Sequence, residues 1–169
     1  MKQPSHMGED DFVAAFGDIF EHTPQIARRA YQQGFGPAQD RADGLHTALV
    51  GVMRQMSHDE KLALINAHPD LAGRLALAKE LTADSTKEQG SAGLDTLSPE
   101  ELTKFTSLND SYKARFGFPF IMAVKGAGKD AILAAFERRI AHDVETEFQE
   151  ALTQIERIAL LRLKDRLPA

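Results

Sequence analysis

Cysteine is absent from this sequence of 169 residues. Its absence excludes a disulfide framework, a thiolate metal site and a thiol nucleophile. Long apolar runs are missing as well, since stretches such as residues 158–161 (Ile-Ala-Leu-Leu) are far too short for a membrane span or a signal-peptide core. We therefore expect a soluble, cytoplasmic protein that does not interact with a membrane.

A basic surface is also missing. The net charge is -5, and acidic and basic residues are interspersed, so no face of the chain is suited to neutralising phosphates. The six histidines show no H-E-x-x-H spacing, and residues 125–129 (Lys-Gly-Ala-Gly-Lys) lack the spacing of a phosphate-binding loop. We expect no nucleic acid partner and no metal.

Strand patterns are scarce, because no stretch alternates between apolar and polar residues with many β-branched side chains. Helical periodicity is common instead, and a hydrophobic content of 43% can fill an ordinary core. The sequence predicts an all-α, single-domain bundle of about seven or eight helices. Within it, residues 1–8 are expected to be a flexible leader and residues 9–169 the helical domain.

Capping signals place several helix ends. Thr23-Pro24 is typical of an N-cap followed by proline at the first helical position. Ser57 and Ser98 each precede a glutamate by three residues, which predicts capping boxes at both positions, and Gly117 predicts the end of the second of these helices. From Gly128 the pattern stays helical to Leu167, and we predict a break near His142-Asp143 because one helix of that length is unusual in a small domain.

His68 is the first candidate site residue. It precedes Pro69, which disfavours helical geometry at the histidine, so the imidazole is expected to project from a helix terminus. An imidazole there can act as a general acid or base near neutral pH. The alternative is structural, with His68 capping one helix and Asp70 capping the next.

A second candidate segment lies between Thr82 and Gly93, where large apolar residues are almost absent. A capping box at Ser85 and Glu88 would explain it as a surface helix start. The functional alternative turns Glu88 and Gln89 inward, where a carboxylate and an amide suit a ligand with ureido and imide groups.

The third candidate segment is the turn at residues 116–120 (Phe-Gly-Phe-Pro-Phe). Three phenylalanines in five residues are more typical of a core than of a site. The turn backbone, however, presents amide and carbonyl groups without helical partners, and a ligand is one way to satisfy them.

These segments, with their neighbours, resemble the OHCU decarboxylase family. The resemblance rests on stretches that occur in the family's order: residues 67–73 (AHPDLAG), Leu81-Thr82 with Ser85, Glu88 and Gln89, residues 92–95 (AGLD), Phe105, Leu108-Asn109, Tyr112, residues 115–121 (RFGFPFI), Glu147, Ala151-Leu152, Ile155, Ile158 and Arg162-Leu163. It extends from about residue 12 to residue 167.

The resemblance implies an all-helical homodimer without a cofactor that decarboxylates 2-oxo-4-hydroxy-4-carboxy-5-ureidoimidazoline to (S)-allantoin in urate degradation. It also implies catalytic roles for His68, Glu88 and Arg162, with Arg157 and Arg166 as alternative registers for the arginine. The implied substrate-binding residues are Pro69, Ser85, Thr86, Lys87, Glu88, Gln89, Phe118, Pro119, Phe120, Ile121 and Met122.

Two other classes of function fit the same residues. One is a non-catalytic helical ligand-binding or interaction domain, in which the polar segments are only helix caps. The other is a ureide hydrolase that uses Glu88 and His68 with a recruited metal.

Overall fold

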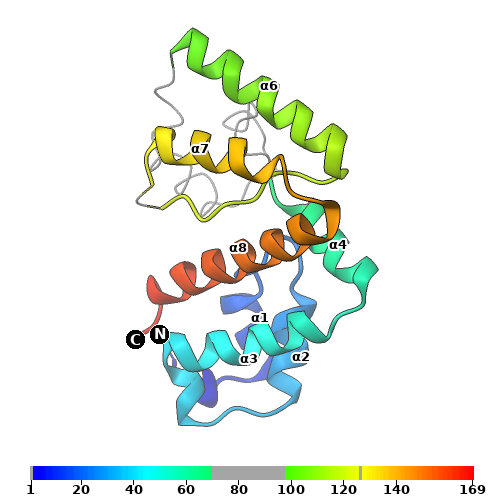
Figure 1. Cartoon of the computed structure of the whole chain (residues 1–169). Helices are drawn as coiled ribbons and strands as arrows, with labels where there is room; N and C mark the ends of the chain where they lie inside the picture. The colour runs from blue at the N-terminus through cyan, green and yellow to red at the C-terminus, as the bar shows by residue number, and fades with distance from the viewer. Residues whose placement is uncertain (1, 70–97, 126) are drawn as a thin grey trace. The chain divides into compact units, whose positions relative to one another are not determined.

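The computed structural model describes residues 2–69, 98–125 and 127–169. In these ranges the regular structure is entirely helical, which confirms the predicted all-α class (Figure 1). The elements are η1 (Pro4–His6), α1 (Glu9–Phe16), α2 (Gln25–Gln32), η2 (Pro37–Asp40), α3 (Ala42–Gln55), α4 (His58–Ala67), α6 (Pro99–Phe116), α7 (Lys129–Arg139) and α8 (Val144–Lys164). None of the helices in the described ranges is long and apolar enough to cross a membrane.

The chain divides into two compact units. Unit 1 comprises Met1–Ala67 and Glu156–Ala169, and unit 2 comprises His68–Ile155. Helix α8 therefore contributes residues to both.

In unit 1, α1 packs against α2, α2 against α3, and α3 against η2. The core of this unit is apolar and fully buried, with Phe12, Phe16, Ile26, Leu45, Leu49 and Met53 at its centre. The Phe12 ring stacks on that of Phe16 and meets that of Phe35 edge-on. Burial of such side chains supplies most of the stability of a small helical unit.

Ser5 and Met7, near the start of the chain, make hydrogen bonds within unit 1. Ser5 donates two hydrogen bonds to Asp40, from its backbone N at 2.7 Å and from its Oγ at 2.6 Å. The Tyr31 hydroxyl donates to the Met7 carbonyl at 2.8 Å. These contacts join η1 to η2 and α2.

The predicted N-cap of α2 is wrong by one residue. Thr23 Oγ1 donates to the Glu21 carbonyl at 2.7 Å, so this hydroxyl caps no helix, and Pro24 occupies the N-cap position instead. α1 is also shorter than the spacing of its phenylalanines indicates. It ends at Phe16, and Ile19 and Phe20 are buried beyond its C-terminus.

In unit 2 the predicted helix ends are confirmed. Ser98 Oγ accepts from the Glu101 backbone N at 3.2 Å, and Glu101 Oε1 accepts from the Ser98 N at 3.0 Å, which completes the capping box of α6. Gly117 ends α6 with φ of 77°, a conformation that glycine adopts without steric cost. The break between α7 and α8 falls at residues 140–143, where Asp143 Oδ1 accepts from the Thr146 N at 2.7 Å.

The core of unit 2 is aromatic. α6 and α7 lie side by side (Figure 1). One ring cluster joins α6, α7, the segment between them and α8, and it is formed by Tyr112, Phe116, Phe118, Phe120, Phe136 and Phe148. The closest pair is Phe120 and Phe136, whose ring centroids lie 3.7 Å apart.

Candidate functional site

His68 lies directly after the last residue of α4, as the proline that follows it predicts. The N-terminus of α4 is fixed by the predicted capping box, in which the Glu60 N donates to Ser57 Oγ at 3.1 Å. The imidazole is buried, with 7% of the residue exposed, and Pro69 is half-buried. The histidine is therefore held at a helix terminus and shielded from bulk water. Both features suit an acid-base group.

The structure does not describe the second candidate segment, between Thr82 and Gly93. Ser85, Thr86, Lys87, Glu88 and Gln89 lie outside the described residues, as does Asp70. The proposed roles of Glu88 and Gln89 stay predictions.

The third candidate segment, residues 116–120, overlaps the implied substrate-binding residues 118–122, which follow the left-handed Gly117. Phe118, Phe120 and Ile121 are at most 3% exposed, Pro119 is buried, and Met122 is half-buried. The phenylalanine rings face the aromatic cluster, as expected for a core. Any ligand contact made by Phe118 or Phe120 must therefore use the backbone.

Part of this backbone is satisfied by the protein. The Ile121 carbonyl accepts a hydrogen bond from Arg139 Nη1 at 2.5 Å, and the Ala123 N donates to Gln154 Oε1 at 3.0 Å. Both partners are buried side chains of neighbouring helices, α7 and α8. The segment is thus fixed from two sides without a ligand.

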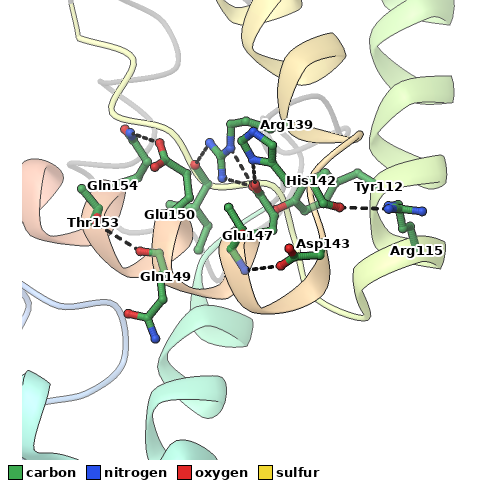
Figure 2. A network of polar contacts seen from close by, with 12 residues as sticks. Tyr112, Arg115, Arg139, His142, Asp143, Glu147, Gln149, Glu150, Thr153 and Gln154 are labelled. Carbon is green, nitrogen blue, oxygen red and sulfur yellow. Dashed lines mark hydrogen bonds and ion pairs between the residues drawn. The ribbon is translucent and has the colours of Figure 1, made fainter.

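A buried polar network contacts this segment through Arg139 (Figure 2). Glu147, fully buried in the first turn of α8, accepts from the Tyr112 hydroxyl at 2.5 Å and from Arg139 Nε at 2.6 Å. Arg139 Nη2 also pairs with the same carboxylate. The other carboxylate oxygen lies 3.1 Å from His142 Nδ1, and this nitrogen must carry the proton because a carboxylate only accepts.

Charge and burial in the network reinforce each other. Removing a carboxylate and a guanidinium from water is costly unless both are paired and hydrogen-bonded, and here both are. Burial and the hydrogen bond to Glu147 raise the pKa of Tyr112, so its hydroxyl remains a donor at neutral pH. The Arg139 guanidinium lies over the Phe120 ring at 4.3 Å, which adds a cation–π contact.

Arg162 belongs to unit 1 and is 2% exposed. Its Nη2 donates to Glu21 Oε1 at 2.8 Å and its Nη1 to the Ile19 carbonyl at 3.1 Å. Of the two alternative arginines, Arg157 is exposed, and Arg166 pairs with Asp18. Among these three, Arg162 is the one held inside the fold by a fully buried carboxylate.

Sequence reasoning missed the roles of Arg139 and Glu21. A signal for the first was present, because Arg139 continues the apolar face of α7 after Ile132 and Phe136. A charged residue at a core position indicates a buried pair. Glu21 follows a buried phenylalanine in a turn, and no periodic pattern marks it.

Comparisons with known proteins agree with this description. The OHCU decarboxylase family model matches residues 5–164. A protein of Haloferax volcanii named 2-oxo-4-hydroxy-4-carboxy-5-ureidoimidazoline decarboxylase is 43% identical over 98% of this chain and 95% of its own length. The mouse protein of that name is 32% identical over 100% of this chain and 93% of its own length.

Solved structures show the same fold. A crystal structure of (S)-allantoin synthase superposes with a TM-score of 0.76 at 29% identity, over 97% of this chain and 52% of that one. An all-α fold that carries a buried histidine after its fourth helix is thereby placed in a known class of carbon–carbon lyases. The chain belongs to the OHCU decarboxylase family, and it is an enzyme of the carboxy-lyase class.

Proposed function

We propose that this enzyme decarboxylates 2-oxo-4-hydroxy-4-carboxy-5-ureidoimidazoline to (S)-allantoin in urate degradation, without a cofactor. The observation that carries the proposal is the 43% identity with the Haloferax decarboxylase across 98% of the chain. The relative of Bacillus subtilis named uric acid degradation bifunctional protein PucL points to the same pathway, with 39% identity over 98% of this chain and 32% of its own length.

The chemistry suits side chains alone. Cleavage of the bond to the carboxyl carbon releases carbon dioxide and leaves an electron pair on the ring carbon. The adjacent ring imine accepts that pair and its nitrogen takes up a proton from solvent, so neither a lysine Schiff base nor thiamine is required as an electron sink. The intermediate is enediol-like. It becomes allantoin when its hydroxyl proton leaves and the carbon that bears the ureido group gains a proton.

His68 is the proposed general acid-base group. Protonation of the intermediate from one face fixes the S configuration, and a buried imidazole held at the end of α4 has the restricted orientation that this requires. Its burial and its place after a capped helix support the role. In the proposal, Glu88 and Gln89 with the backbone of residues 118–122 hold the ring and the ureido group.

Arg162 is proposed to engage an anionic or carbonyl oxygen of the substrate. A guanidinium can bind two oxygens at once through its planar arrangement of donors. The hydrogen bonds to Glu21 and the Ile19 carbonyl fix the orientation of that plane. The proposal also includes a homodimer, as the family resemblance implies, and a cytoplasmic location, as expected from the lack of cysteine and of long apolar runs.

The decisive experiment is the substitution His68→Asn. Loss of general acid-base catalysis should lower the rate of (S)-allantoin formation by roughly a hundred- to ten-thousand-fold. The substrate is generated from urate, and the product is followed by circular dichroism. His58→Asn is the matched control, because His58 begins the same helix and its side chain is 66% exposed. If His68→Asn forms (S)-allantoin near the parent rate, the assigned role is wrong.

Treatment with a chelator separates the proposal from a metal-dependent ureide hydrolase. We expect an unchanged rate of carbon dioxide release after prolonged dialysis against EDTA. Chelator-sensitive turnover, restored by a divalent metal, would instead support the hydrolase.

A further inference from the structure

We propose that Arg139 is a positioning residue of the decarboxylation site, which holds the backbone of residues 118–122 in its substrate-binding geometry through the network of Tyr112, Glu147 and His142. This inference rests on the proposed function, because that function assigns residues 118–122 to substrate binding. None of the residues in the network belongs to the site residues inferred from the sequence.

Arg139 contacts residues 118–122 at two points. Its Nη1 donates to the Ile121 carbonyl at 2.5 Å, and its guanidinium lies over the Phe120 ring at 4.3 Å. Both contacts are buried, since Arg139 and Phe120 are at most 1% exposed. A hydrogen bond from a charged donor in a dry environment is stronger than a neutral one. The position of the Ile121 peptide group is therefore coupled to the position of Arg139.

Arg139 is itself held in place by Glu147. Glu147 binds its Nε at 2.6 Å and pairs with Nη2, so the plane of the guanidinium has one orientation. The same carboxylate oxygen accepts from Tyr112 of α6, while the other is bound by His142 in the α7–α8 connection. Figure 2 shows these side chains converging on Glu147 from three parts of unit 2.

Residues 119–124 have no helical or strand hydrogen bonds of their own, and their conformation depends on contacts with neighbours. Gly117 at the start of this segment allows the sharp change of direction, and Gln154 holds the Ala123 N at its end. Between these two points, Arg139 is the charged side chain that binds the backbone among the described contacts. A backbone that must present groups to a ligand needs such support.

Lysine at position 139 cannot replace these functions together. Its ammonium is a point donor on a flexible stem, whereas the planar guanidinium binds Ile121 and Glu147 while lying flat on Phe120. Arg139→Lys keeps the charge beside Glu147, so the buried carboxylate is not left unpaired. The substitution therefore tests geometry more than charge.

The test is steady-state kinetics of the full chain with three variants. For Arg139→Lys we expect KM to rise about tenfold with kcat within about twofold, because the backbone of residues 118–122 binds substrate and transition state alike. The dissociation constant of (S)-allantoin, measured by calorimetry, should rise by the same factor. Tyr112→Phe removes one hydrogen bond from Glu147 and should raise KM and the dissociation constant of (S)-allantoin about threefold.

Ile132→Val is the matched control. Ile132 is fully buried on α7, like Arg139, but has no contact with the polar network among those described. This variant should lose stability while KM and the allantoin dissociation constant stay at the parent values. A merely structural role of Arg139 predicts the same pattern for Arg139→Lys, since a lower folded fraction reduces the rate per total protein without changing KM.

A readout without substrate separates this inference from the proposed function. Amide hydrogen exchange at residue 118 and residues 120–123 should be faster in Arg139→Lys and Tyr112→Phe, but not in Ile132→Val. If the parent protein forms no excess of (S)-allantoin, the proposed function fails while the exchange result still decides the positioning role. Unchanged exchange, KM and allantoin affinity in Tyr112→Phe and in Arg139→Lys would overturn the inference. If Arg139→Lys does not fold, Tyr112→Phe decides alone.

Discussion

At the scale of single residues, two buried ion pairs anchor the described structure. Arg139 with Glu147 lies in unit 2, and Arg162 with Glu21 lies in unit 1. In each pair both side chains are at most 2% exposed. Replacing such a pair by apolar residues is often tolerated, whereas removing one partner leaves an uncompensated charge in a dry environment. Single substitutions within these pairs should therefore be far more damaging than surface substitutions.

Glu147→Gln tests this expectation for unit 2. The amide keeps the shape of the carboxylate but removes its charge, so Arg139 is left buried without its counterion. We expect the free energy of unfolding to fall by roughly 3–5 kcal/mol, measured by urea titration followed by circular dichroism. The control is Glu145→Gln, two residues earlier on α8 at an exposed position, with an expected change within about 0.5 kcal/mol. Equal effects of the two substitutions would contradict the role of the pair.

The spacing of buried residues on α8 indicates one member of each ion pair. On α8, the residues Glu147, Ala151, Ile155, Ile158 and Arg162 recur at intervals of three or four, and all five are buried. A charged residue at each end of an apolar stripe predicts a buried charge with a partner. The partners Glu21 and Arg139 could not be identified in this way, because the contacts join residues distant in the sequence or separated by an irregular connection.

At the scale of helices, glycines at two positions should respond to alanine in opposite ways. Gly117 has a positive φ and no atom within 4 Å of an added Cβ, so the cost of Gly117→Ala is conformational. We expect a loss of about 1–2 kcal/mol. Gly51 lies exposed within α3 and also has open space around it, so Gly51→Ala should stabilise by about 0.4–1 kcal/mol.

Thermal unfolding of the two variants beside the parent protein measures both effects. The melting temperature should fall for Gly117→Ala and rise for Gly51→Ala. A rise in both would show that the C-terminus of α6 relaxes out of the left-handed conformation.

The N-terminus of α8 gives a prediction for pH. A hydrogen bond from the Thr146 backbone N–H holds the pKa of Asp143 below the ordinary value of 3.8, and a hydrogen bond with the Thr146 side chain adds a smaller effect. A depressed pKa contributes stability above the unfolded-state value, and this contribution is lost as the pH falls through the folded-state value. Asp143→Asn should keep the cap near neutral pH, because asparagine also caps helices, but should weaken the loss of stability below about pH 4.

Urea titrations of the parent and Asp143→Asn between pH 2 and pH 7 measure this difference. The two curves should lie close together near neutral pH and separate below about pH 4, where the parent protein should lose more stability than Asp143→Asn. Parallel curves over the whole range would exclude Asp143 as a contributor to acid sensitivity.

Helix ends marked by local capping signals were the most predictable elements. The capping boxes at Ser57 and Ser98, the stop at Gly117 and the break before α8 all follow from local chemistry. Thr23 misled the prediction because its hydroxyl has a competing local acceptor, the Glu21 carbonyl. Ile19 and Phe20 kept a helical spacing although they are buried through irregular structure. Burial patterns report the core, and only capping groups report where a helix ends.

At the scale of the whole molecule, the sequence predicts a single helical domain over residues 9–169. The described structure clusters into two compact units, and α8 is continuous through the boundary at Ile155 and Glu156. The fold class and the family were accessible from the sequence because helical periodicity and the spaced motifs are local. The assignment of Arg162 to one unit and of His68 to the other was not, since it depends on contacts distant in the chain.

Unfolding as a single domain should be cooperative, so that both units lose structure at one denaturant concentration. The composition offers a reporter for each unit, because the chain has no tryptophan and two tyrosines. Tyr31 belongs to unit 1 and Tyr112 to unit 2. Biosynthetic 3-fluorotyrosine therefore places one fluorine label in each unit without a substitution. Two ¹⁹F resonances that disappear at the same urea concentration would support a single domain, and separate midpoints would show two.

The same fluorine labels can also report binding of (S)-allantoin. The Tyr112 hydroxyl donates a hydrogen bond to the carboxylate that orients Arg139, and its ring packs against Phe118 and Phe120 of the proposed substrate-binding segment. The ¹⁹F resonance of Tyr112 should therefore shift when (S)-allantoin is added, while the Tyr31 resonance serves as an internal reference. Tyr112, a residue of the aromatic core, would then report ligand binding.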